Sequence, residues 1–241
     1  MDTPTKSILV ISAHAADFVW RAGGAIALYS GRGCRVRILC LSYGERGESE
    51  RLWKMPGKTL ERVKQMRQDE SEKAAANLGA EIRFFDSGDY PLRLTDYLTD
   101  EMVAEFRSCQ PQIVLTHSSA DPYNPDHGQA CEITLRTRVY AQAAGYPADG
   151  KKLGAPPVFA FEPHQPEQCG FKPEVLLDIT PVFDRKRQAM ETMEAQEHLW
   201  EYYTDLARRR GVQAVRNSGK SGIKYAEAYQ RFYPQVTDDL S

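Results

Sequence analysis

The sequence predicts a single-domain α/β fold with a mostly parallel sheet and helices on both of its faces. Short apolar runs of strand length alternate with longer segments of helical spacing as far as residue 140. The 241 residues suffice for one large core, and no change in composition divides them. We therefore expect one domain over residues 1–241, with an α/β core at residues 1–144. The C-terminal part, residues 145–241, is expected to complete the sheet and one end of the functional site.

Each predicted strand is an apolar run followed by a polar or glycine-containing stretch. The first is SILVIS at residues 7–12, and the others lie at residues 35–41, 81–85, 113–116, 158–161 and 175–179. Helices are expected in the intervals, where Gly31 and Gly79 are typical helix stops. Their predicted ranges are residues 19–31, 59–78, 97–109, 127–140 and 182–198. The order of the strands in the C-terminal part does not follow from the pattern.

The charges of the chain are nearly balanced, with 31 Lys and Arg against 33 Asp and Glu. No electrostatic footprint for nucleic acid or an anionic membrane therefore stands out. No apolar run approaches the roughly 18 residues of a membrane span, and the N-terminus lacks the order of regions found in signal peptides. The five cysteines are scattered, without a Cys-x-x-Cys spacing, as in a reducing compartment. We expect a cytoplasmic protein that binds neither nucleic acid nor membrane.

Polar side chains follow four of the predicted strands at the point where each strand ends. His14 and Asp17 follow the first strand, and residues 44–48 follow the second. Residues 121–127 follow the fourth strand, and His164 follows the strand at residues 158–161. Ligands of open α/β sheets bind in the crevice beyond the carboxyl ends of the strands. We therefore expect these residues to converge on one edge of the sheet.

Three of these residues form a possible set of metal ligands. His and Asp side chains suit zinc or ferrous iron, and two His with one carboxylate leave positions for water and substrate. His14, Asp17 and His127 are the predicted ligands. The alternative is structural: a strand-end His is often only hydrogen-bonded, and residues 126–127 open a helix as a cap region does.

Two motifs carry a resemblance to a known family. Residues 11–17 read ISAHAAD, with Gly23 and Gly24 shortly after them, and residues 124–127 read NPDH. They resemble the PIG-L/LmbE-like family of metal-dependent deacetylases, which carries Ala-His-Pro-Asp-Asp-Glu and His-Pro-Asp-His on a Rossmann-like fold. The resemblance implies that each chain holds one divalent metal ion, zinc in most of the family, with Fe²⁺ or Co²⁺ as alternatives. By the same resemblance the ligands are His14, Asp17 and His127.

The chain departs from the family motifs at three positions. Ala16 stands where the family has its general base, Phe18 where it has Glu, and Asn124 where it has the first His of the second motif. A deacetylase without its base should lose much of the roughly 10²–10⁴-fold that general acid–base catalysis contributes. The metal ligands are therefore kept, whereas the machinery for amide hydrolysis is not.

Longer strings resemble a hydratase branch of the same family. They are HAADFVWRAGG at residues 14–24, GERGES at residues 44–49, FEPHQPEQC at residues 161–169 and QEHLWEYY at residues 196–203. The resemblance implies addition of water to 4-oxalomesaconate (4-carboxy-2-hydroxymuconate), which gives 4-carboxy-4-hydroxy-2-oxoadipate in gallate and protocatechuate degradation. It also implies a small tricarboxylate anion as substrate and a homo-oligomer.

Hydration needs an activated water and an acid that protonates carbon. Glu48 is the candidate that orients the water or takes its proton, and His164 is the candidate acid because imidazole titrates near neutral pH. Without the family context, Glu48 could equally be a solvated loop charge and His164 a hydrogen-bonded loop residue. The roles of His117 and His198 stay open between the site and the structure.

A tricarboxylate also requires cationic or amide donors, because guanidinium binds carboxylate through two hydrogen bonds. Arg46 lies in the loop with Glu48, Arg67 matches a family arginine that contacts substrate, and Asn124 precedes the ligand His127 by three residues. These three are the predicted substrate contacts. The alternative for each is an ordinary surface or salt-bridged residue.

Two other functions compete with the hydratase. One is a zinc-dependent N-deacetylase of an amino sugar or small amide, and Ala16 argues against it. The other is a non-catalytic metal-binding protein, and the retention of Glu48 and His164 argues against that.

Overall fold

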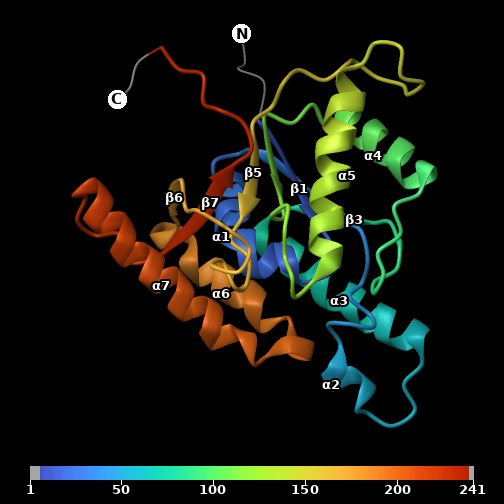
Figure 1. Cartoon of the computed structure of the whole chain (residues 1–241). Helices are drawn as coiled ribbons and strands as arrows, with labels where there is room; N and C mark the ends of the chain where they lie inside the picture. Colours follow the sequence, from blue (N-terminus) through green and yellow to red (C-terminus); the bar gives the residue numbers. More distant parts are fainter. Residues whose placement is uncertain (1–5, 239–241) are drawn as a thin grey trace.

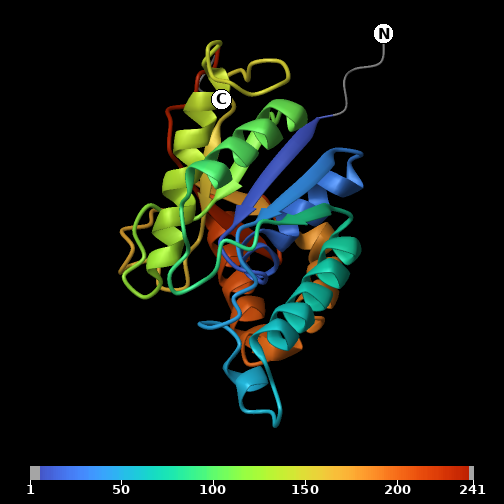
Figure 2. The same ribbon diagram turned by 90° about the vertical axis from the view of Figure 1, so that its right-hand side faces the viewer.

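The computed structural model describes residues 6–238 and contains a seven-stranded sheet between two layers of helices (Figures 1 and 2). The strands lie in the order β3-β2-β1-β4-β5-β7-β6. Their bounds are β1 Ser7–Ser12, β2 Arg35–Cys40, β3 Glu81–Phe84, β4 Ile113–Thr116, β5 Val158–Phe161, β6 Val175–Asp178 and β7 Ala226–Arg231. The predicted α/β class is confirmed.

The helices occupy the intervals between strands, with a second group in the C-terminal third. Their bounds are α1 Asp17–Gly31, α2 Glu50–Trp53, α3 Leu60–Leu78, α4 Asp96–Cys109, α5 Pro125–Gln142, α6 Phe183–Glu191 and α7 Leu199–Ser218. Thr59 begins α3 by accepting a hydrogen bond from the backbone N–H of Arg62, and Gly79 ends the helix at a φ of 73°. These are the N-cap and left-handed C-cap that the sequence favours.

The strand directions create a crevice next to β1. Strands β3, β2, β1, β4 and β5 are parallel, whereas β7 is antiparallel to both β5 and β6. After β1 the chain adds strands on one side through β2 and β3, and then returns to pair β4 on the other side of β1. The carboxyl ends of β1 and β4 therefore flank a topological switch point, where open α/β sheets bind their ligands.

Both faces of β1 are buried, and successive apolar side chains project alternately from one face and the other. Ile8 and Val10 belong to the core on the side of α1, α3, α6 and α7. Leu9 and Ile11 belong to the core on the side of α4 and α5. Figure 2 shows α4 and α5 on one face of the sheet and α3 on the other. A strand covered on both faces explains the continuous apolar run that predicted it.

A buried ion pair fixes α1 against the C-terminal strands. The Glu227 carboxylate on β7 accepts hydrogen bonds from the backbone N–H groups of Gly24 and Ala25, at 2.7 and 2.8 Å. Lys186 on α6 donates to the same carboxylate at 2.7 Å. A Cβ atom at Gly24 would lie 2.7 Å from the side chain of Ile179, so this approach requires glycine. Residues far apart in sequence therefore set the position of the helix that carries Asp17.

The single helix predicted at residues 182–198 is wrong. Helix α6 ends at Glu191, a 3₁₀ turn follows at Glu194–Gln196, and α7 begins at Leu199. The break occurs because the backbone N–H of Ala195 donates to the Glu70 carboxylate of α3, at 2.9 Å. Strand β7 and the short helix α2 were not predicted either.

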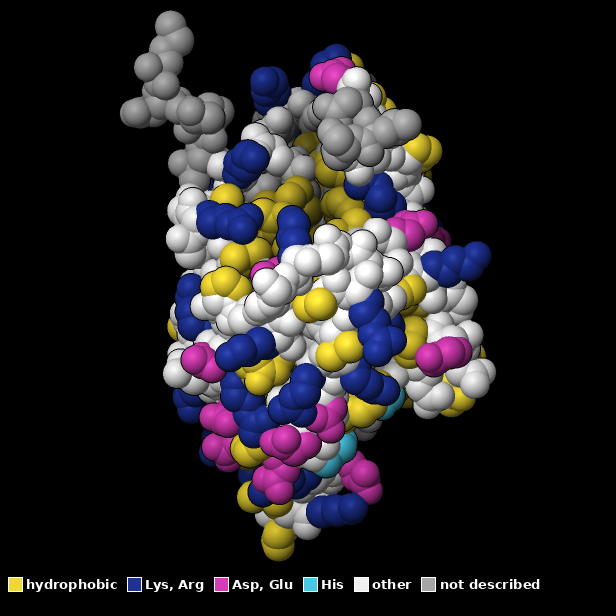
Figure 3. Space-filling model, turned by 90° about the vertical axis from the view of Figure 1, so that its left-hand side faces the viewer, with side chains coloured by type: hydrophobic (Ala, Val, Ile, Leu, Met, Phe, Trp, Pro, Cys, Tyr) yellow, Lys and Arg dark blue, Asp and Glu magenta, His cyan; other side chains and the backbone are white. Residues whose placement is uncertain are grey.

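The surface carries both signs of charge, and basic and acidic side chains lie together on the face shown in Figure 3. Within residues 6–238, no helix is long and apolar enough to cross a lipid bilayer.

Candidate metal centre and active site

Four side chains meet at the switch point. His14 follows β1, Asp17 is the first residue of α1, Glu48 lies in the loop after β2, and His127 lies in the first turn of α5. Each offers one ligand atom, and these four atoms lie within 4.8 Å of one another. The predicted convergence of His14, Asp17 and His127 is thus present in the structure, and Glu48 joins the cluster as a fourth potential ligand.

Two imidazole nitrogens in this cluster lack partners of their own. His14 Nδ1 lies 3.2 Å from Asp17 Oδ2 and 3.2 Å from Glu48 Oε1. His127 Nε2 lies 3.4 Å from Asp17 Oδ1 and 3.9 Å from Glu48 Oε1. Both nitrogens are buried, and neither has a hydrogen-bond partner among residues 6–238. Two unpaired imidazole nitrogens facing two carboxylates form a donor set that fits a divalent ion such as zinc.

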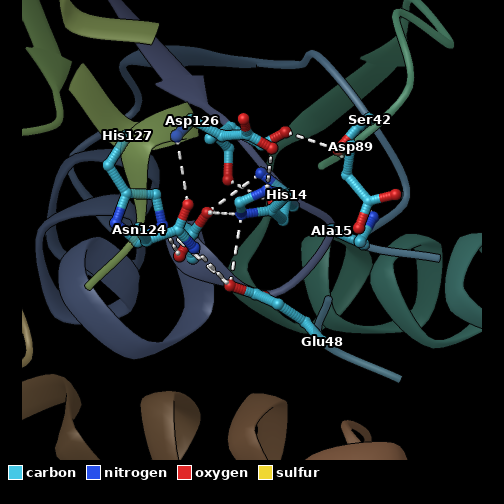
Figure 4. Close-up of polar contacts among 12 residues, drawn as sticks. His14, Ala15, Ser42, Glu48, Asp89, Asn124, Asp126 and His127 are labelled. Carbon is cyan, nitrogen blue, oxygen red and sulfur yellow. Dashed lines mark hydrogen bonds and ion pairs between the residues drawn. The ribbon is translucent and has the colours of Figure 1, made fainter. Parts of the chain in front are cut away.

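The opposite nitrogens of both rings are held by carboxylates. His14 Nε2 lies 3.3 Å from Asp126 Oδ2, and His127 Nδ1 lies 2.8 Å from Asp121 Oδ2. Figure 4 shows Asp126 and Glu48 on opposite sides of the His14 ring. Metal-binding histidines almost always donate their second N–H in this way, which fixes the tautomer and turns the free lone pair toward the ion.

The electrostatics of the cluster call for positive charge. Burial opposes ionisation of His14, but Glu48 and the contacts with Asp126 and Asp17 raise its pKa well above the usual 6.5. Burial likewise opposes ionisation of the Asp17 carboxyl, but His127 and His117 hold its pKa well below the ordinary value. The protein thus stabilises ionised carboxylates in a buried place, where an uncompensated charge is costly. A divalent ion between them would supply the compensation.

His117 lies directly after β4 and supports the cluster from behind. Its Nε2 accepts a hydrogen bond from the backbone N–H of Ala13 at 2.9 Å and lies 3.5 Å from Asp17 Oδ2. Its ring stacks on that of His127, with centroids 4.2 Å apart. Burial, followed by the proximity of His127, lowers the pKa of His117 well below 6.5. His117 is therefore a neutral hydrogen-bond acceptor that holds the turn after β1.

A cavity of about 210 Å³ opens beside the cluster. Its wall includes Glu48, Asn124 and His164, together with Gln196 and Tyr203 from the C-terminal part of the chain. The structure therefore places His164 at the same cavity as Glu48. The ring of His164 stacks on Tyr202 with centroids 4.3 Å apart, and burial lowers its pKa below 6.5.

Asn124 connects the metal cluster to α5. Its side-chain oxygen accepts a hydrogen bond from the backbone N–H of Asp126 at 3.2 Å, which caps the helix. Its amide nitrogen donates to Glu48 Oε1 at 3.3 Å. Asn124 thus lines the cavity and also orients Glu48.

The other two predicted substrate contacts lie elsewhere. Arg46 is exposed, its guanidinium donates to the backbone carbonyl of Asp89 at 3.0 Å, and it lines a separate hollow of about 300 Å³. Arg67 is completely buried behind the cavity, where it pairs with Glu70 at 2.6 Å and donates to Gln196 Oε1 at 3.0 Å. Arg67 therefore reaches the cavity through Gln196, and the structure gives no support to a contact by Arg46.

Several residues of the site were missed in the sequence. Asp121 and Asp126 were treated as loop and cap residues, although both stand close to His127 and acidic partners of histidine ligands are common. Arg21 is not among the predicted substrate contacts either. It lies four residues after Asp17 on α1, and its Nε is 3.5 Å from Asp17 Oδ1. A helical spacing of four places both side chains on one face, which was the available signal.

A comparison with family models bears on these motifs. The model described as PIG-L, GlcNAc-PI de-N-acetylase, matches residues 9–137, more than half of the chain. This chain belongs to the PIG-L family. The match includes the turn after β1, the loop after β2 and the first turns of α5, and therefore all four clustered side chains.

Relatives of this chain are named for different activities. The chain is 52% identical to 4-oxalmesaconate hydratase of Pseudomonas putida KT2440, over 100% of this chain and 95% of the relative. It is 28% identical to 1D-myo-inositol 2-acetamido-2-deoxy-alpha-D-glucopyranoside deacetylase of Rhodococcus erythropolis, over 65% of this chain and 60% of the relative.

Solved structures extend the comparison to the whole fold. The crystal structure of GalB, the 4-carboxy-2-hydroxymuconate hydratase of the same Pseudomonas strain, superposes with a TM-score of 0.96 and 51% identity. The match covers 98% of this chain and 100% of GalB. The N,N'-diacetylchitobiose deacetylase of Pyrococcus horikoshii has a TM-score of 0.76 at 21% identity, covering 95% and 84% of the two chains, and it shares the fold.

Replacement of the carboxylate behind His127 tests the metal centre. We expect Asp121→Asn to weaken divalent-metal affinity by about 10- to 100-fold, because a neutral amide oxygen accepts from the imidazole N–H more weakly than a carboxylate does. Affinity is measured by competition with a chromogenic chelator, with the exposed Asp149→Asn as the control. Equal metal affinity in Asp121→Asn and the wild type would show that His127 is not held as a ligand.

Proposed function

We propose that this chain is a hydro-lyase that adds water to the conjugated double bond of 4-oxalomesaconate (4-carboxy-2-hydroxymuconate), giving 4-carboxy-4-hydroxy-2-oxoadipate in aromatic catabolism. The observation that carries the proposal is the 52% identity to a 4-oxalmesaconate hydratase along the whole chain. The structural match to GalB at a TM-score of 0.96 supports the same reaction.

The residue between two clustered side chains agrees with this reaction. Ala16 lies between the proposed ligands His14 and Asp17 in sequence, is completely buried and precedes α1 as its N-cap. Its methyl group offers no proton acceptor where the deacetylase motif has a carboxylate. Amide hydrolysis therefore lacks a base at this position, whereas hydration can use an acceptor on a different loop.

The proposed metal ligands are His14, Asp17 and His127, and zinc is the ion that their chemistry fits best. A divalent ion held there would supply Lewis acidity and would make a water molecule more acidic. Glu48 accepts the proton of the attacking water while Asn124, at 3.3 Å, holds the carboxylate in place. Burial opposes ionisation of Glu48, but His14 lowers its pKa below 4.5, so the carboxylate is ionised and can accept a proton at neutral pH.

His164 completes the reaction as the proposed acid. The hydroxyl group of water forms a bond to one carbon of the double bond, and the other carbon takes a proton from the His164 imidazolium. The support for this role is its place in the wall of the cavity that also contains Glu48. Stacking on Tyr202 holds the ring, and the Tyr202 hydroxyl donates to the His164 carbonyl at 2.6 Å.

We also propose the setting in which the enzyme acts. Residues 145–241 contribute Gln196 and Tyr203 to the cavity wall, which supports their role in completing the active site. All five cysteines are free, as expected in a reducing cytoplasm. The proposed enzyme is a homo-oligomer that takes a small tricarboxylate anion.

The reaction is tested by following the ultraviolet absorbance of the conjugated substrate with and without a chelator. We expect loss of absorbance with the metal-loaded protein, because hydration removes the double bond from conjugation. Chelation should abolish this loss, and addition of Zn²⁺ should restore it. Acetate release from N-acetylglucosamine derivatives, with no change in absorbance, would instead establish a deacetylase.

Restoring the family carboxylate is expected to damage hydration. Ala16→Asp places another negative charge beside Asp17 and Glu48, which repels an anionic substrate. We expect kcat/KM for hydration to fall roughly 10²- to 10³-fold, the range of electrostatic effects in active sites, without gain of deacetylation. The variant Ala16→Asn introduces a neutral side chain of the same size as aspartate, and it should lose less activity than Ala16→Asp. Normal hydration by Ala16→Asp would contradict the charge argument.

The proposed acid predicts the pH dependence of the reaction. Because burial lowers the pKa of His164 below 6.5, its imidazolium form exists below that pKa and is lost as the pH rises through it. We expect kcat/KM to fall with rising pH along this limb. His164→Gln should remove the limb and lower activity, whereas the exposed His198→Gln should keep it. An unchanged profile in His164→Gln would exclude the acid role.

A further inference from the structure

Arg21 is a buried arginine whose guanidinium has no hydrogen-bond partner in the described part of the chain. It lies on α1, one helical turn after Asp17, and its side chain is only 6% exposed. Within residues 6–238 it donates no hydrogen bond, and its one ion pair is the 3.5 Å approach of Nε to Asp17 Oδ1. A guanidinium offers five N–H donors. A buried charge with unused donors is costly unless a further partner binds it.

The unused donors of Arg21 belong to the wall of the active-site cavity. Arg21 lines the cavity of about 210 Å³ together with Glu48 and His164. Among the described residues of that wall it is the only lysine or arginine. Asp17, Glu48 and Asp121 lie in the same wall, so an anionic substrate meets three carboxylates and one fixed cation from the protein.

A second donor is oriented toward the cavity by Arg67. Arg67 donates from Nη2 to Gln196 Oε1 at 3.0 Å, so the NH₂ group of the Gln196 amide points away from Arg67. That NH₂ group makes no hydrogen bond to another described residue, and Gln196 lines the cavity. Because Glu70 holds Arg67 at 2.6 Å, the amide is fixed in one orientation.

We propose that Arg21, assisted by the Gln196 amide, binds a carboxylate of the substrate and thereby selects polycarboxylates, with Arg67 as a positioning residue for Gln196. The guanidinium is planar and pairs with a carboxylate through two parallel hydrogen bonds, a geometry that lysine does not offer. The inference rests on the proposed hydratase function, because that function brings a tricarboxylate into this cavity. It assigns to Arg21 the role that the sequence favoured for Arg46.

A purely structural role for Arg21 makes different predictions. If Arg21 only neutralises Asp17, its removal should disturb the metal ligand and lower the metal affinity, with carboxylate recognition falling in proportion. If Arg21 binds substrate, metal content should stay normal while KM rises. Metal content and KM therefore separate the two roles.

The first measurement compares Arg21→Met with Arg32→Met, which changes an exposed arginine at the far end of the same helix. We expect Arg21→Met to raise KM for the tricarboxylate about 10- to 100-fold, the range for hydrogen bonds to charged groups, with kcat less affected. Arg21→Lys should be intermediate, and zinc content should equal that of the wild type. Loss of zinc in Arg21→Met, or an unchanged KM, would overturn the proposal.

The second measurement uses a ligand that does not react. Titration calorimetry of the zinc-loaded protein with propane-1,2,3-tricarboxylate should show binding to the wild type and to Arg32→Met, and about 10- to 100-fold weaker binding to Arg21→Met. Gln196→Leu should weaken binding independently, and it replaces Arg21→Met as the test variant if Arg21→Met does not fold. Equal binding by the wild type, Arg21→Met and Gln196→Leu refutes the inference while hydration of the natural substrate stands. If the two variants bind more weakly than the wild type, but the wild type does not hydrate the natural substrate, the proposed function alone is refuted.

Discussion

The buried turn after β1 is the constraint on which the site depends. A turn at the centre of a parallel sheet is shut off from water, so its backbone polar groups need partners from the protein. Ser42 donates to the carbonyl of Ala13 at 2.9 Å, and Ser71 donates to the carbonyl of Ala15 at 2.8 Å. His117 accepts from the N–H of Ala13 at 2.9 Å. The turn is thus bound by the loop after β2, by α3 and by the end of β4, and these contacts fix the direction in which its own side chains project.

The same contacts explain why the proposed ligands are in place in the absence of an ion. His14 lies within the turn, and its backbone N–H donates to Asp17 Oδ2 at 2.9 Å, which orients the carboxylate at the start of α1. Asp126 is held in turn by the N–H groups of Tyr90 and Leu92, at 2.8 and 2.9 Å. Each of the two rings is therefore backed by a carboxylate that itself accepts hydrogen bonds from the backbone: Asp126 from Tyr90 and Leu92, and Asp121 from Tyr123 at 3.0 Å. Such support lowers the reorganisation that metal binding requires.

The parts of this arrangement differ in how far a sequence can predict them. Strand β1 and the position of His14 were predictable, because an apolar run and a polar residue at its end are local signals. The break after Glu191 was not, because the polar group that stops the helix belongs to Glu70, more than a hundred residues earlier. Arg46 is a predicted substrate contact because it shares a loop with Glu48, whereas Arg21 is not among the predicted contacts. The burial of Arg21 and its unused hydrogen-bond donors are visible only in the structure, and they make Arg21 the better candidate for this contact.

The balance of charges in the cavity wall links the cluster of proposed metal ligands to the proposed hydration. Asp17, Glu48 and Asp121 contribute three negative charges to the cavity wall, and Arg21 contributes one positive charge. A divalent ion would bring the sum to zero, so the proposed tricarboxylate substrate would enter without net repulsion. A fourth carboxylate at position 16 would make the wall negative again and would stand beside both ligands in the turn. In the proposed reaction the methyl group of Ala16 is therefore more than the loss of a base: it would keep the metal-loaded cavity neutral for a trianion, while Glu48, the proposed proton acceptor, lies at the neighbouring strand end.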